Sequence, residues 1–113
     1  TKATIVDLVE TFNYLIGLTV KTIDVLDGFK VVIGTNPQGD SVLVIWRKIK
    51  EKDNAALEKF LHKKLGVNPR EYGEFSDYDH IYVNGDHTLE DPRSKVKMIE
   101  IEFKRLMFDV SDV

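Results

Sequence analysis

Residues 18–46 read LTVKTIDVLDGFKVVIGTNPQGDSVLVIW, and this stretch decides the fold. Apolar and polar residues alternate from Leu18 to Leu26, with a change of phase near Lys21-Thr22, which predicts a strand that carries a bulge. Asp27-Gly28 is typical of a two-residue hairpin turn. We therefore expect Phe29 to Gly34 to form the return strand.

A second turn is predicted at Asn36-Pro37-Gln38-Gly39, because proline presets its own φ and glycine tolerates a positive φ. Val42 to Trp46 then runs without alternation, as a strand covered on both faces does. This segment is expected to form the centre of the sheet. Trp46 is expected in the core, and the alternative is that it stacks on a nucleic-acid base.

Helices are predicted on both sides of this meander. Ile5 to Ile16 has apolar residues at helical spacing, with Gly17 at its end. Asp53 is expected to cap a helix from about Asn54 to Leu65. The remaining expected elements are a loop from Asn68 to Tyr78, a strand from Ile81 to Val83, a loop from His87 to Arg93, and a final helix from about Ser94 to Phe108 that is buried through Ile99, Phe103, Leu106 and Met107.

The order helix, three-stranded antiparallel meander, helix, strand, helix indicates one α+β domain over residues 1–113. A chain of this length can bury a single core without disulfides or a structural metal. The longest apolar run, Val42 to Trp46, is far below the roughly 20 residues that cross a bilayer, and no signal peptide is visible. The absence of cysteine fits a cytoplasmic protein. Because the chain opens at Thr1 without a methionine, we expect it to be a piece of a longer protein.

Restriction-type nucleases have a core with the same order of elements, so cleavage of DNA has to be considered. Their chemistry needs a carboxylate on the second strand and Asp/Glu-x-Lys on the third, which hold a divalent cation and activate water. Phe29 to Gly34 and Val42 to Trp46 contain no acid, and Asp40 precedes its strand. Glu102-Phe103-Lys104 has the spacing but falls in the expected last helix. The sequence therefore predicts a nuclease-like order without the catalytic residues.

Charge is distributed unevenly along the chain, although its net value is only −3. Residues 47–64 carry seven Lys or Arg against three acids, whereas residues 71–91 carry seven acids and no Lys or Arg. This pattern indicates one basic and one acidic face, or simply a solvated helix and a solvated loop. The candidate DNA contacts are Arg47, Lys48, Lys50, Lys52, Lys59, Lys63 and Lys64.

Polar residues also gather where the strand at Ile81 to Val83 ends, a place where loop side chains often bind ligands. The candidate partner or loop site there consists of Tyr82, Asn84, Asp86 and His87. Two histidines seven residues apart, with acids between them, match no metal-ligand spacing of known geometry. His62 is expected to be solvated. No serine has the surroundings of a catalytic nucleophile, and no glycine-rich phosphate loop is present. We expect no catalytic, cofactor-binding or metal-binding residue in this chain.

Four blocks resemble a known family when they are taken together. They are Glu10 to Leu18 (ETFNYLIGL), Val44 to Arg47 (VIWR), Ile81 to Asp86 (IYVNGD) and Phe103 to Phe108 (FKRLMF). In their order and spacing they resemble the carboxy-terminal region of modification subunits of type III restriction–modification systems, and of similar adenine-specific DNA methyltransferases. The resemblance covers nearly the whole chain, and the last block is similar to the natural terminus in that family.

The resemblance implies a parent enzyme that moves a methyl group from S-adenosylmethionine to N6 of adenine in duplex DNA, after flipping the base. The family's chemistry rests on a Phe-x-Gly-x-Gly cofactor loop and an Asp-Pro-Pro-Tyr pocket, and this sequence contains neither. Asn36-Pro37 and Asp91-Pro92 lack the second proline and the aromatic residue. The expectation is therefore a non-catalytic domain without its own cofactor. Its partner would be another subunit of a restriction–modification complex or a second copy, with at most weak duplex DNA contact. The alternative is a free-standing module that binds protein or nucleic acid.

Overall fold

The computed structural model describes residues 5–64, 78–86 and 96–111, which form three helices and a five-stranded mixed sheet. In chain order the elements are α1 (Ile5–Leu15), β1 (Thr19–Leu26), β2 (Phe29–Thr35), β3 (Ser41–Trp46), α2 (Asn54–Lys64), β4 (His80–Val83), β5 (Val96–Met98) and α3 (Ile99–Ser111). The strands lie in sequence order from β1 to β5. β1, β2 and β3 pair antiparallel, whereas β4 is parallel to β3 and β5 is parallel to β4. The α+β class and the meander are thus confirmed.

The turns of the meander follow from local residue chemistry. Asp27 and Gly28 both have positive φ, 51° and 82°, as the central residues of a type I′ hairpin turn do. The predicted bulge is present, because the pairing of β1 with β2 shifts register between Val20 and Thr22. Gly34 lies at this shift, opposite Val20. A Cβ on Gly34 would come within 2.2 Å of the Thr19 carbonyl oxygen, so the two backbones approach too closely for any side chain there.

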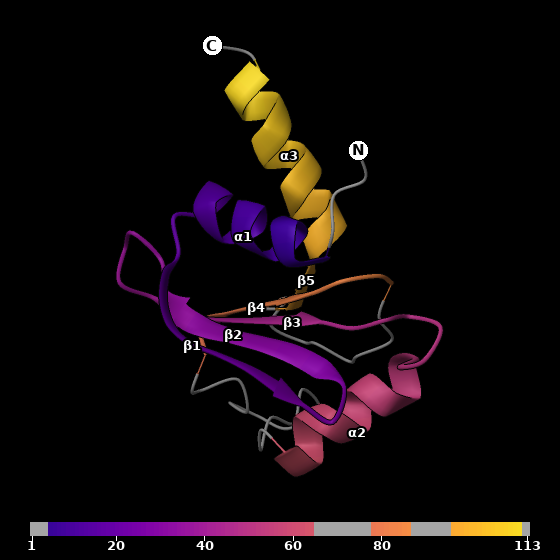
Figure 1. Ribbon diagram of the computed structural model, residues 1–113. Helices are drawn as coiled ribbons and strands as arrows, with labels where there is room; N and C mark the ends of the chain where they lie inside the picture. Colours follow the sequence, from indigo (N-terminus) through magenta and orange to yellow (C-terminus); the bar gives the residue numbers. More distant parts are fainter. Residues whose placement is uncertain (1–4, 65–77, 87–95, 112–113) are drawn as a thin grey trace.

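The sheet is covered on both faces, by α1 and α3 on one side and by α2 on the other (Figure 1). β3 lies at the centre of the strand order, and Val42 to Trp46 are all buried, as expected. Leu43 and Ile45 pack toward α2, where Leu57, Phe60 and Leu61 complete one core cluster. Val42, Val44 and Trp46 pack with Val9 and Phe12 of α1 and with Ile99 of α3 in the second cluster.

Capping residues set the start of α2 and the end of α1, as predicted. Asp53 caps α2: its carboxylate accepts a hydrogen bond from the Ala56 N–H at 2.9 Å, and its carbonyl accepts one from Leu57. α1 ends at Gly17, which has a φ of 67°, and the Leu18 N–H donates back to the Asn13 carbonyl at 2.8 Å. None of the helices within the described ranges is both long and apolar enough to cross a bilayer.

The last helix differs from the prediction. Residues 96–98 form the edge strand β5, and α3 begins only at Ile99, so a helix from Ser94 was wrong at its start. Three residues carry too little alternation to identify a strand, and their pairing with β4 is a tertiary interaction. Ile99 is buried and Phe103 packs against the core, but Met107 is 47% exposed, contrary to the predicted burial. The loops predicted over residues 68–78 and 87–93 lie outside the described residues except for Tyr78.

Candidate functional site

Arg47, which directly follows β3, is directed inward rather than toward solvent. The residue is 5% exposed. Its guanidinium donates to three carbonyl oxygens, those of Asn84 (3.1 Å), Asp86 (3.1 Å) and Lys52 (3.3 Å). Burial lowers the pKa of Arg47, and the Glu100 and Asp53 carboxylates oppose this shift. Arg47 therefore holds the turn after β4 against the loop after β3.

Asn84 continues the pairing of β3 with β4 through its side chain. The Arg47 N–H donates to Asn84 Oδ1 at 2.9 Å, and Asn84 Nδ2 donates to the Arg47 carbonyl at 2.8 Å. Gly85, with a φ of 78°, follows, and its N–H donates to both oxygens of the Glu100 carboxylate at 2.9 and 3.0 Å. The Asn-Gly turn thus ties β3, β4 and α3 together, through part-buried bonds to Arg47 and exposed bonds to Glu100.

One aromatic cluster occupies the layer between the sheet and the helices α1 and α3. The Phe12 ring lies at its centre, with ring centroids 6.0 Å from Trp46, 5.3 Å from Tyr82 and 6.0 Å from Phe103. Trp46 and Tyr82 meet it edge-on, whereas Phe103 stacks at 22°. Trp46 is 8% exposed and belongs to the core, which confirms the prediction for this residue.

Tyr82 is the member of the predicted loop site that lies in the core, because it is only 7% exposed. Its hydroxyl donates to Glu102 Oε2 at 3.3 Å, and the other oxygen of Glu102 accepts a hydrogen bond from Arg105 Nε. Burial first, and then the Glu102 charge and hydrogen bond, raise the pKa of Tyr82 to about 12. A neutral, donating hydroxyl at this position suits a structural tie between β4 and α3.

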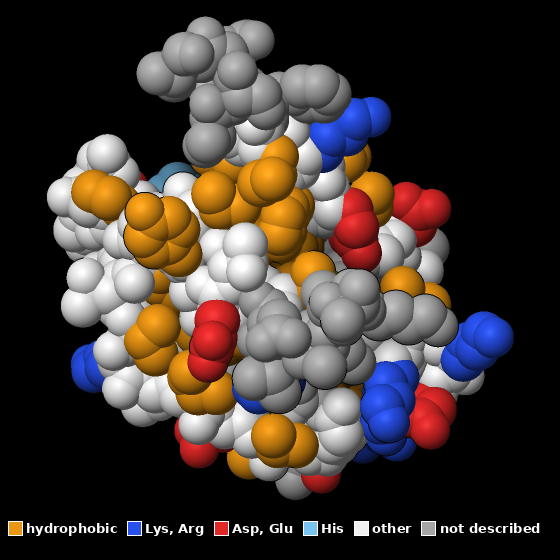
Figure 2. Space-filling view, turned by 45° about the horizontal axis from the view of Figure 1, so that its top comes forward, with side chains coloured by type: hydrophobic (Ala, Val, Ile, Leu, Met, Phe, Trp, Pro, Cys, Tyr) orange, Lys and Arg blue, Asp and Glu red, His pale blue; other side chains and the backbone are white. Residues whose placement is uncertain are grey.

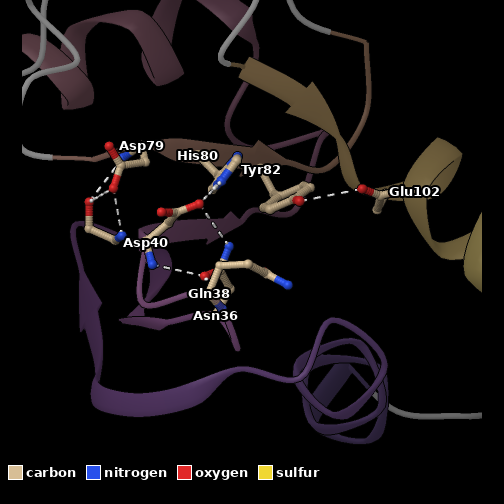
Figure 3. Close-up of polar contacts among 8 residues, drawn as sticks. Asn36, Gln38, Asp40, Asp79, His80, Tyr82 and Glu102 are labelled. Atoms are coloured by element: carbon tan, nitrogen blue, oxygen red, sulfur yellow. Dashed lines mark hydrogen bonds and ion pairs between the residues drawn. The ribbon is translucent and has the colours of Figure 1, made fainter.

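A second cluster of polar side chains, formed by Asn36, Asp40 and His80, lies at the opposite end of β4 (Figure 3). His80 Nε2 is 3.0 Å from Asp40 Oδ2, and Asn36 Nδ2 donates to the same oxygen at 3.4 Å. These contacts lower the pKa of Asp40, the His80 hydrogen bond most of all. Asn36 Oδ1 also accepts the N–H groups of Gln38 and Asp40, as in an Asx turn.

Asp79 and Ser41 join the starts of β4 and β3 beside this group. The Ser41 N–H and hydroxyl both donate to Asp79 Oδ2, at 2.9 and 3.2 Å, and the Asp79 N–H contacts Ser41 Oγ at 2.9 Å. The serine hydroxyl is therefore hydrogen-bonded to Asp79 and does not approach His80 as a catalytic nucleophile would. Within the described part of the chain, no three His, Asp or Glu side chains converge as metal ligands.

Cavities open beside these polar residues. A cavity of about 210 Å³ is lined by His80, Tyr82, Glu102 and Arg105 together with residues of α1 and the Asn36 turn. A larger one of about 590 Å³ lies between Asp86, β5 and α3. Among the lining side chains, Tyr82 and Arg105 are hydrogen-bonded to Glu102, and His80 is paired with Asp40.

The candidate DNA contacts fall into separate groups. Lys48 and Lys50 are exposed in the loop after β3, and Lys59 and Lys63 are exposed one turn apart on α2. Lys52 lies with its ammonium 5.8 Å from the Phe29 ring centroid, and Arg47 faces inward. The side chain of Lys64 lies outside the description. On the face that carries α1 and α3, the Lys and Arg side chains stand apart from one another (Figure 2).

Some predicted site residues lie where expected and others could not be tested. His62 is exposed on α2, as predicted. Asp86 is exposed, with its carbonyl engaged by Arg47, and His87 lies outside the described residues. The prediction missed Asp40, Glu100 and Glu102. The role of Asn36 could have been predicted, since the side chain of Asn at the start of a turn commonly accepts a hydrogen bond from the backbone N–H two residues later.

No protein-family model, curated protein or solved structure matches the chain.

Proposed function

We propose that this chain is a non-catalytic, carboxy-terminal accessory domain of an adenine-specific DNA methyltransferase of the type III restriction–modification class. Its role is assembly, with another subunit or with a second copy. The observation that carries the proposal is the convergence of the four sequence blocks on which the family resemblance rests. Each block contributes one ring to the aromatic cluster: Phe12, Trp46, Tyr82 and Phe103.

This convergence supports the resemblance because contact in space is a separate observation from the order of the blocks along the chain. The resemblance rests on the order of the blocks along the chain, and in the fold the four blocks also pack into one core cluster. Here one ring, Phe12, contacts the other three. The polar residues of the same blocks also meet, since Arg47 of one block is bonded to Asn84 of another. The four blocks therefore contribute to one packed core.

The same contacts argue against catalysis by this domain. Residues that the blocks share, such as Arg47, Asn84 and Tyr82, use their polar groups to join strands and helices. The cofactor loop and the base pocket that the resemblance implies have no counterpart in the sequence. S-adenosylmethionine would accordingly be bound by a preceding part of the parent protein, and base flipping would occur there. Such a parent enzyme acts in the cytoplasm.

We further propose that the fold is that of a restriction-type nuclease core reused without cleavage. A helix, an antiparallel meander, a second helix and a strand parallel to β3 follow in the order of that core. β2 and β3, which would carry the metal-binding acids, contain only apolar and uncharged residues apart from Lys30. This interpretation is compatible with assembly and with a weak DNA contact, and it predicts no hydrolysis by this chain.

The test begins with the coding sequence that precedes residue 1 in the native gene. We expect it to encode both the Phe-x-Gly-x-Gly and the Asp-Pro-Pro-Tyr motifs. Deleting residues 1–113 from that gene product should then leave S-adenosylmethionine binding intact, while the other subunit no longer co-purifies. The absence of both motifs would overturn the proposal in favour of a free-standing binding module.

A second measurement uses the 113-residue chain alone. Calorimetry should detect no binding of S-adenosylmethionine, because the loops described offer no cradle of N–H groups for its carboxylate and ribose. Binding with micromolar affinity would contradict the non-catalytic assignment. The deletion protein without this domain serves as the matched positive control.

A further inference from the structure

The outer edge of β1 is the most open part of the sheet. β1 pairs with β2 on one side, and within the described residues no strand pairs with its other side. All eight of its residues are exposed, and none belongs to either core cluster. A strand with a free edge presents unpaired N–H and C=O groups, which favour the addition of another strand.

One face of this strand is apolar. Val20, Ile23 and Val25 lie opposite Gly34, Val32 and Lys30 of β2, on the sheet face that α1 and α3 cover further along. They are 40%, 48% and 69% exposed. Hydrophobic side chains reach the surface in several places on this side of the molecule (Figure 2). Natural proteins normally protect such edges, so this one is expected to be covered.

The bulge makes the strand self-complementary. The register with β2 passes over Lys21, which leaves seven paired residues in β1: Thr19, Val20, Thr22, Ile23, Asp24, Val25 and Leu26. Ile23 is the middle one. A two-fold axis through Ile23 would place it opposite its own copy, Val25 opposite Val20, Asp24 opposite Thr22 and Leu26 opposite Thr19.

This register satisfies both faces of the paired strands. Val20, Ile23 and Val25 all lie on one face, so three apolar cross-strand pairs would form there. On the other face each Asp24 would meet Thr22 of the other copy, whose neighbour in the chain is Lys21, so residues of opposite charge would come near each other. Moving the axis to Asp24 would set two carboxylates opposite each other, and moving it to Thr22 would leave Val25 and Leu26 unpaired.

We propose that β1 pairs antiparallel with β1 of a second copy of this chain, so that two five-stranded sheets become one continuous sheet. The inference deepens the assembly role and rests on the proposed function for its biological meaning. Its physical argument depends only on the exposure, register and charges of β1. A strand of another protein could also add to this edge, and the experiment distinguishes that case.

The experiment uses the absence of cysteine from the chain. Residues directly opposite each other in an antiparallel pair are close enough for a disulfide after a small adjustment. Ile23→Cys should therefore give a disulfide-linked dimer under mild oxidation. Val20→Cys and Val25→Cys should cross-link efficiently only when the two variants are mixed. Tyr14→Cys, at a position that is 84% exposed on α1, is the matched control and should cross-link poorly.

Sedimentation equilibrium tests the charges. Lys21→Asp or Asp24→Lys alone should weaken self-association of the 113-residue chain by about tenfold or more, and the double exchange should restore it. Both positions are exposed, so unchanged thermal melting of each variant would show that folding is intact. A chain that stays monomeric up to its solubility limit would overturn the proposal, even if a strand of another protein binds the same edge. Equal cross-linking at residues 23 and 14 would overturn it too.

The two proposals fail separately. If the chain is monomeric, the pairing of β1 is overturned, and the methyltransferase proposal is still tested by the motifs encoded upstream of residue 1. Missing motifs leave the cross-linking pattern of β1 unaffected.

Discussion

Trp46 is the last residue of β3, packs against α1 and directly precedes Arg47. It is 8% exposed and contacts Phe12 edge-on at 6.0 Å. Trp46→Ala would leave a cavity in a packed layer, so we expect a loss of about 3–5 kcal/mol in the free energy of unfolding. Urea titration followed by circular dichroism measures it, because Trp46 is the single tryptophan and its fluorescence is lost with the change.

Tyr14→Ala is the control for Trp46→Ala, since Tyr14 is an aromatic residue that is 84% exposed. Its effect is expected within about 0.5 kcal/mol. If Trp46→Ala proved as mild as Tyr14→Ala but abolished binding of a partner, the core assignment of Trp46 would be wrong.

Tyr82 should make stability depend on alkaline pH. Its pKa is raised from 10.0 to about 12 in the folded protein, so the unfolded state loses this proton first. The contribution of the neutral hydroxyl is therefore fully present below pH 10 and is lost as the pH rises through about 12. Tyr82→Phe should remove this dependence.

The measurement for Tyr82 is urea unfolding below pH 10 and near pH 12, in the native protein and in Tyr82→Phe. The difference in unfolding free energy between the two conditions should be smaller in the variant. Lysines also titrate in this range, and the comparison cancels them because both proteins contain the same ones. An equal pH dependence in both proteins would contradict the raised pKa of Tyr82.

Among the elements, the β1–β2 hairpin depends on a glycine inside a strand. A Cβ at Gly34 would approach the Thr19 carbonyl oxygen to 2.2 Å, and that atom is backbone. Gly34→Ala should therefore cost about 1–3 kcal/mol, as overpacking does, and amide protons of β1 should exchange faster. Gly39→Asn is the control, because a Cβ there meets nothing within 4 Å and Asn tolerates its positive φ of 85°. Unchanged exchange in β1 would show that the hairpin tolerates the added methyl group.

Elements whose ends are set by local chemistry could be predicted from the sequence. Asp27-Gly28 fixes its own turn through positive φ, and Asp53 fixes the start of α2 through its carboxylate. β5 could not be predicted, since Val96 to Met98 becomes a strand only by pairing with β4. The start of α3 was misplaced for the same reason.

The candidate site could be predicted only in part. Polar residues gather at the end of β4, and their partners in the fold were not foreseen. Gly85 bonds Glu100 across 15 residues, and Tyr82 bonds Glu102 across 20. No spacing rule connects such pairs. Arg47 was counted among the candidate DNA contacts because it begins the basic segment 47–64, whereas its guanidinium donates to three carbonyl oxygens inside the fold.

For the whole molecule, contact with duplex DNA is expected to be weak and indifferent to sequence. The exposed lysines among the candidate contacts, Lys48, Lys50, Lys59 and Lys63, would neutralise phosphates and read no base edges, so the affinity should fall steeply with salt. Binding titrations at two salt concentrations, with Lys59→Glu and Lys63→Glu in parallel, measure this.

We expect the positive charge of α2 to provide most of the binding to DNA. Reversing Lys59 and Lys63 should remove most of the binding at low salt. Reversal of Lys97, an exposed lysine on β5, is the control and should have less effect. Sequence-selective binding that survives both salt and the α2 reversal would show that another surface contacts DNA.

The parallel pairing of β3 with β4 also sets the order in which the chain folds. Ser41 and Asp79 meet across 38 residues, whereas the strands of the meander are joined by short turns. Closing the longer loop costs more chain entropy, so the meander is expected to form first and β4 to dock later. Gly28→Ala should then mainly slow refolding, and Ser41→Ala should mainly accelerate unfolding, in stopped-flow measurements.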